Sequence, residues 1–128
     1  SFEQDITGNF TKVYNVPKNA EAILRTSCYD CHSNNTNYPW YSNVQPVGFF
    51  MEHHIKEAKE DLNFDEWGKY SKRKQENKLD RIVKQIKSDE MPLASYTLIH
   101  KNARLTTVQK EEIMDWLSKI KDSISSQY

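Results

Sequence analysis

A five-residue motif, Cys28-Tyr29-Asp30-Cys31-His32, constrains this chain more than any other feature of its sequence. The C-x-x-C-H spacing is typical of c-type haem attachment, in which two thiols add to the vinyl groups on one edge of the porphyrin. The histidine that follows is then positioned to bind the iron from one side of the ring. The motif therefore predicts one covalent haem c on Cys28 and Cys31, with His32 as a ligand of the iron.

Two other interpretations of the motif are less favourable. A thioredoxin-type redox site needs a strand before the two cysteines and a helix after them, whereas here a helix is expected before the motif and a loop after it. A structural zinc site would combine the cysteines with a pair of histidines at H-x3–5-H spacing. His53 and His54 are adjacent and would point in different directions on a helix, which argues against zinc.

The sixth iron ligand must come from elsewhere in the chain. The candidate donors are Met51, Met91, Met114, His53, His54 and His100. We favour Met91, because it lies in an expected loop and is followed by Pro92, which restricts the local backbone. Met51 and Met114 lie in expected helices and are interpreted as core residues. His54 is the strongest competitor, since it shares the apolar face of its helix, where a histidine is more often a hydrogen-bonded core residue.

The pattern of apolar residues predicts an all-α fold. Only three glycines and four prolines interrupt the 128 residues, and no internal repeat occurs. Helical spacing of apolar residues predicts about four helices. Their expected ranges are Pro17 to Ser27, Pro46 to Leu62, Lys72 to Lys87, and Thr106 to about Ser123. We expect long irregular loops between them, at 33–45 and 88–104, and a cytochrome c-like arrangement around one covalent haem.

The composition and charge of the chain reduce the number of function classes that fit it. Eighteen basic residues balance eighteen acidic ones, so nothing in the net charge indicates binding to nucleic acid. No apolar run is long enough to span a bilayer. The mean hydropathy of -0.87 implies a modest core that a buried cofactor would enlarge. We expect a single domain at 16–122, with an N-terminal extension at 1–15 and a C-terminal tail at 123–128.

Several linked sequence blocks resemble the bacterial haem-binding domain proteins, a family of small c-type cytochrome-like modules of the cell envelope. The resemblance runs from about Val16 to Trp116. It rests on Cys28 to Asn34, Tyr38-Pro39-Trp40-Tyr41-Ser42, Leu62-Asn63-Phe64 with Trp67, and Glu90-Met91-Pro92 with Tyr96, His100, Ala103 and Leu105.

The resemblance implies roles for individual residues. Cys28, Cys31 and His32 would hold the haem, and Met91 occupies the Met-Pro position expected to supply the distal ligand. The side chains implied to contact the cofactor are Tyr38, Trp40, Tyr41, Trp67 and Tyr96, although core packing is an equally good interpretation of Trp67. Similar proteins tend to have Gly-Arg where this chain has Ala58-Lys59. Lysine lacks the bidentate geometry of arginine, which weakens the expectation that a haem propionate is paired at this position.

The leading functional hypothesis is an electron-transfer protein with one haem, which requires no enzymatic activity. The resemblance implies a periplasmic location, with a precursor secreted across or anchored to the inner membrane, because covalent haem attachment occurs outside the cytoplasm. We expect a monomer that docks transiently with redox partner proteins, with the Lys69 to Lys78 stretch as a candidate docking patch. The alternative is a haem sensor or a weakly peroxidase-like protein whose sixth iron site is open or displaceable.

Overall fold

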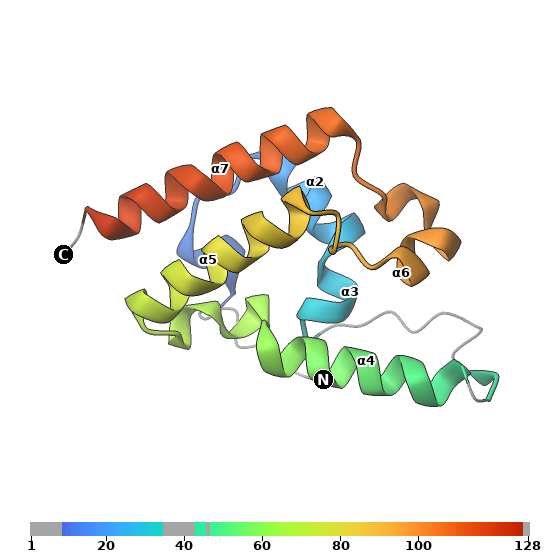
Figure 1. Ribbon diagram of the computed structural model, residues 1–128. Coiled ribbons are helices and arrows are strands. Elements are labelled where there is room, and N and C mark those ends of the chain that lie inside the picture. Colours follow the sequence, from blue (N-terminus) through green and yellow to red (C-terminus); the bar gives the residue numbers. More distant parts are fainter. Residues whose placement is uncertain (1–8, 35–42, 46, 127–128) are drawn as a thin grey trace.

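The computed structural model describes residues 9–34, 43–45 and 47–126 (Figure 1). These residues form helices joined by short connections, and no strand occurs among them. The prediction of an all-α fold is therefore confirmed. The elements are α1 (Phe10–Val13), α2 (Lys18–Ser27), α3 (Tyr29–His32), α4 (Val47–Asp61), the 3-10 helix η2 (Phe64–Lys69), α5 (Lys72–Lys87), α6 (Ala94–Ile99), the 3-10 helix η3 (Lys101–Ala103) and α7 (Thr107–Ser125).

The four longest helices begin within one residue of the positions that the sequence indicates. Pro17 immediately precedes α2, where its missing amide proton costs nothing. The Ser71 hydroxyl accepts a hydrogen bond from the Lys74 backbone amide at the start of α5. At the start of α7, Thr106 and Gln109 form a capping box, each side chain bonding to the backbone amide of the other. Local hydrogen bonding at the first turn thus fixes where α5 and α7 begin.

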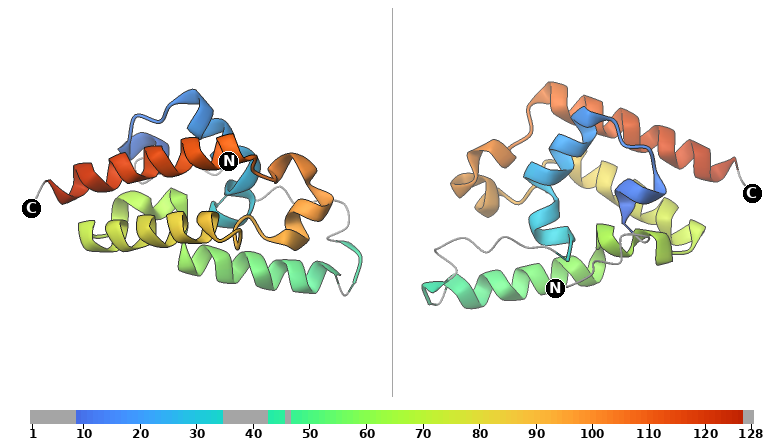
Figure 2. Two further views of the ribbon diagram at one scale, coloured as in Figure 1. Left: turned by 45° about the horizontal axis from the view of Figure 1, so that its top comes forward. Right: turned by 180° about the vertical axis from the view of Figure 1, so that it is seen from behind.

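The helices surround a core that lies mainly between α2, α5 and α7. Helices α5 and α7 run side by side, with α7 along one edge of the molecule, α4 along the opposite edge and α5 between them (Figures 1 and 2). The short helix α3 packs against both α2 and α4 and so connects the two edges. The buried hydrophobic cluster consists of Phe10, Ala20, Ile23, Leu24, Leu62, Phe64, Trp67, Leu79, Ile86, Leu105, Ile113, Leu117, Ile120 and Ile124.

The core extends past both ends of the expected domain. Phe10 is completely buried, and its ring makes edge-on contacts with Tyr14, Phe64, Trp67 and Trp116 at centroid distances of 5.0, 5.0, 4.9 and 5.5 Å. At the other end, Ile124 is only 1% exposed. Residues that the sequence analysis assigned to an extension and a tail therefore contribute to the same core as the central helices.

The stretch at 88–104 is more regular than expected, since it contains α6 and η3. Helix α6 begins without a side-chain cap and is six residues long, so neither a capping signal nor a long apolar stripe marks it in the sequence. The Met91–Pro92 peptide bond, which is cis, lies just before it. Among the described residues, none of the helices combines the length and apolar character that a membrane crossing requires.

Candidate functional site

The two cysteines and the histidine of the motif are brought together by a turn between two helices. Cys28 ends α2 and precedes α3, and its backbone φ and ψ of -125° and -46° redirect the chain there. The backbone amides of Cys31 and His32 both bond to the Cys28 carbonyl, at 3.3 and 3.0 Å. The motif is therefore itself helical from Tyr29 to His32.

Both thiols are half-buried, and no disulfide joins them. Burial raises the pKa of the Cys28 thiol to about 12, with the neighbouring Cys31 thiol as a second cause. Burial also raises the pKa of Cys31, and the Asp30 carboxylate raises it further. Redox-active cysteines need a lowered pKa to provide the thiolate, so this environment does not suit a thioredoxin-type site.

The imidazole of His32 is held in one orientation by two backbone carbonyls. Its Nδ1 lies 3.0 Å from the Ala58 oxygen and 2.8 Å from the Leu62 oxygen, at the end of α4. Carbonyl oxygens only accept hydrogen bonds, so Nδ1 carries a proton, and in the neutral imidazole the lone pair is then on Nε2. The edge of the ring also packs on Phe64 at a centroid distance of 6.5 Å. This is the tautomer and orientation that a metal-binding histidine needs.

His32 faces a cavity of about 320 Å³ between α4 and α5. The cavity is lined by His32, His54, Glu57, Ala58, Asp61, Leu62, Lys78, Arg81, Ile82, Gln85, Met91 and Leu93. It therefore brings His32 together with two of the candidate sixth ligands, His54 and Met91. Aliphatic side chains and charged groups both contribute to the lining, as is usual for a site that binds a mostly apolar cofactor with polar groups at one edge.

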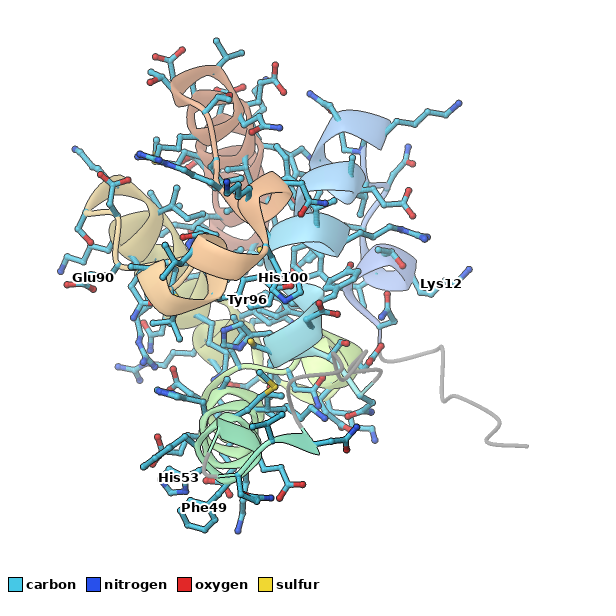
Figure 3. All side chains as sticks on the ribbon, turned by 90° about the vertical axis from the view of Figure 1, so that its right-hand side faces the viewer. Lys12, Phe49, His53, Glu90, Tyr96 and His100 are labelled. Carbon is cyan, nitrogen blue, oxygen red and sulfur yellow. The ribbon has the colours of Figure 1, made fainter. Side chains whose placement is uncertain are left out.

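The other histidines lie away from this cavity. His53 projects from the outer side of α4 and pairs with Glu57, with 3.0 Å between its Nε2 and the carboxylate oxygen (Figure 3). His100 stacks on the ring of Tyr96, with centroids 4.5 Å apart and planes 21° apart. In the part of the chain that the structure describes, no group of three or more His, Cys, Asp or Glu side chains could hold a metal ion. A zinc site built from the cysteines and a histidine pair is therefore not assembled among these residues.

The aromatic residues implied by the resemblance fall into different places. Trp67 is completely buried in the hydrophobic core, where its Nε1 donates a hydrogen bond to the Tyr14 hydroxyl at 2.9 Å. It does not line the cavity, so the packing interpretation accounts for its position. The Tyr96 hydroxyl donates to the Asp30 carboxylate at 2.6 Å and likewise lies outside the cavity lining. Tyr38, Trp40 and Tyr41 lie outside the described residues.

The two other methionines both lie in helices, as expected, but of the two only Met114 is placed as a core residue. Met51 is half-buried on α4, and Met114 packs against the hydrophobic core from α7. Neither side chain lines the cavity that His32 faces. Among the described residues, Met91 is therefore the one thioether in that lining.

Several groups at the site were missed by sequence reasoning. The carbonyls of Ala58 and Leu62 act through the backbone, so their side chains give no signal. Lys78 and Arg81 lie on α5 beside the predicted apolar stripe, and their spacing resembles that of any solvated helix face. In the structure, Arg81 pairs with Asp61 at 2.8 Å, and the Lys78 ammonium contacts the Asp61 backbone carbonyl.

Taken together, the residues present fit a haem: two thiols within one helical turn of His32, a histidine oriented by backbone carbonyls through Nδ1, and a methionine thioether that lines the same cavity as this histidine. Comparison with known protein families supports this interpretation, because a sequence model described as a haem-binding domain matches residues 3–119. Searches of curated proteins and of solved structures returned no matching protein.

Proposed function

This chain belongs to the haem-binding domain family and is a haem-binding protein; on that basis we propose that it holds one haem c covalently and transfers electrons. The bound iron would supply the one-electron redox chemistry. The chain would hold the cofactor through thioethers to Cys28 and Cys31 and bind the iron through His32 and Met91. The observation on which this proposal depends most is the hydrogen bonding of His32, which leaves Nε2 free beside a cavity that Met91 also lines.

The position of the two thiols supports covalent attachment. Cys28 and Cys31 lie within a single helical turn of His32, joined by backbone hydrogen bonds to the Cys28 carbonyl. Their raised pKa values argue against a role as thiolate nucleophiles. Thioether bonds would use both sulfur atoms and would keep the haem on a small domain without the need for a large apolar pocket.

The orientation of His32 favours Met91 over His54 as the sixth ligand. The Nδ1 edge of the imidazole faces α4, so the Nε2 edge faces away from that helix. A ligand opposite His32 would therefore come from an element other than α4. His54 belongs to α4, whereas Met91 lies on the connection between α5 and α6.

A Met/His ligand pair would suit an electron carrier. The thioether stabilises ferrous iron and raises the reduction potential, and a filled sixth site suppresses the binding of gases. We propose that the protein works in the periplasm, where covalent haem attachment takes place, and exchanges electrons with partner proteins. The competing function is a haem sensor or a weak peroxidase, for which the sixth site would be open.

The experiment uses holoprotein matured with covalent haem. A pyridine haemochrome spectrum and the intact mass should both indicate two thioether bonds. The oxidised wild type should have the near-infrared sulfur-to-iron charge-transfer band, and Met91→Ala should abolish it and let the ferrous form bind carbon monoxide. Met51→Ala is the matched control, because Met51 is a half-buried thioether on α4 that does not line the cavity.

Three results would contradict parts of the proposal. An apoprotein with both thiols free after correct maturation would rule out covalent attachment. A wild type that lacks the near-infrared band and binds carbon monoxide at once would favour the sensor. Loss of the low-spin spectrum in His54→Ala, with Met91→Ala unchanged, would identify His54 as the ligand instead.

A further inference from the structure

Two long-range hydrogen bonds join the helices that contain the haem motif to the segment that follows Met91. The Ser27 hydroxyl, at the end of α2, donates to the buried Ala103 carbonyl at 2.7 Å. The Tyr96 hydroxyl, on α6, donates to the Asp30 carboxylate of α3 at 2.6 Å. Because Ser27 and Asp30 lie on either side of Cys28, the α6–η3 segment is attached on both sides of the first haem cysteine.

The Tyr96 side chain has a restricted orientation and makes a strong hydrogen bond. The ring of Tyr96 is half-buried and stacks on His100 at 4.5 Å, so its orientation is restricted (Figure 3). Its acceptor is a carboxylate, and hydrogen bonds to ionised acceptors are stronger than those between neutral groups. The acceptor also belongs to the motif itself, since Asp30 lies between the two haem cysteines.

Met91 lies between this contact and a second attachment. On its N-terminal side, the backbone amides of Glu90 and Met91 donate to the Gln85 carbonyl at 2.9 and 3.1 Å, which holds Met91 at the end of α5. On its C-terminal side, the Tyr96 hydroxyl of α6 donates a hydrogen bond to the Asp30 carboxylate of the motif. The segment that would supply the distal ligand is therefore fixed at both ends.

We propose that Tyr96 is a positioning residue for the sixth iron ligand. Its hydrogen bond to Asp30 holds the Met91 segment against the helix that contains His32, so that the thioether remains on the iron. The two segments that would supply the iron ligands are then joined directly through one tyrosine hydroxyl. This inference rests on the proposed function, because it presupposes that Met91 is the distal ligand.

The test compares Tyr96→Phe, Asp30→Ala and the double variant with the wild-type holoprotein. Imidazole is titrated into the oxidised protein, where it must displace Met91 before it can bind. Loss of a hydrogen bond to a carboxylate should increase the open fraction, and with it the apparent imidazole affinity, by about tenfold. The near-infrared band should also weaken in Tyr96→Phe. Thr97→Val is the matched control, since the hydrogen bond of the Thr97 hydroxyl among the described residues stays within α6, to the Ala94 carbonyl.

The double variant separates positioning from general stability. If Tyr96 acts through Asp30, the double variant should bind imidazole about as tightly as each single variant, because both remove the same contact. Unchanged imidazole affinity in Tyr96→Phe, with a normal wild-type band, would overturn the inference and leave the proposed function intact. Equal changes in the apparent imidazole affinity of Tyr96→Phe and Thr97→Val would also overturn the inference. A wild-type holoprotein without the near-infrared band would overturn both this inference and the proposed ligation by Met91.

Discussion

Replacing Phe10 by alanine tests whether the first described helix belongs to the cooperative core. The Phe10 side chain is completely buried and contacts four aromatic rings at centroid distances between 4.9 and 5.5 Å. Truncation of a buried phenylalanine costs about 3–5 kcal/mol, through lost transfer free energy and the cavity that remains. The dense ring contacts leave little room for relaxation, so we expect a loss near the upper end of that range. Domains of this size are stable by only about 5–15 kcal/mol, so the variant should lose a large share of its stability.

The assay is urea unfolding followed by circular dichroism. The midpoint should fall and the slope of unfolding free energy against urea should stay the same, because the surface exposed on unfolding barely changes. Lys12→Ala is the matched control, since Lys12 lies on the same helix and is exposed; it should change the free energy by less than about 0.5 kcal/mol. A loss below about 1 kcal/mol in Phe10→Ala would refute the reasoning and place α1 outside the cooperative unit.

Three smaller perturbations test other contacts. Thr106→Ala removes the capping box of α7 and should cost about 1 kcal/mol in urea unfolding, whereas the exposed Thr107→Ala should cost clearly less; equal losses would contradict the capping role. Ser27→Ala leaves the buried Ala103 carbonyl without its partner and should cost about 1–3 kcal/mol, so a neutral result would mean that this hydrogen bond is not formed. Burial raises the pKa of the Tyr14 hydroxyl above its ordinary value of 10.0, so the folded protein holds this proton more tightly than the unfolded chain does. The free energy of unfolding should therefore be insensitive to Tyr14 below pH 10.0 and decrease above it, and Tyr14→Phe should make this alkaline decrease less steep; an identical slope would contradict the shift.

The long helices could be predicted because their signals are local and repeated. Helix α5 occupies the predicted range, Lys72–Lys87, and the capping box of Thr106 marks the start of α7 within one residue. Short elements lack such repetition. Helix α1 has four residues, and only tertiary contacts of Phe10 show that it belongs to the core.

The site could be predicted in part for a similar reason. The motif predicts which atoms would hold the haem, but it contains nothing about the backbone carbonyls that orient His32. The sequence does not show whether a tryptophan packs in a core or against a cofactor. Trp67 could therefore be assigned to the core only from its burial in the structure. The family resemblance implies that Tyr96 contacts the cofactor. In the structure its hydroxyl bonds to Asp30, sixty-six positions away in sequence.

The carbonyls that hold His32 have an electrostatic consequence. They lie at the C-terminal end of α4, where the aligned peptide dipoles of a helix sum to about half a negative charge. A hydrogen bond to this negative pole makes the imidazole a stronger electron donor, and ferric iron gains more from such a donor than ferrous iron does. The negative end of helix α4 would thus lower the midpoint potential of the iron, whereas a thioether ligand would raise it. The midpoint potential of the protein would then depend on the balance between the C-terminal end of α4 and the sulfur atom of Met91.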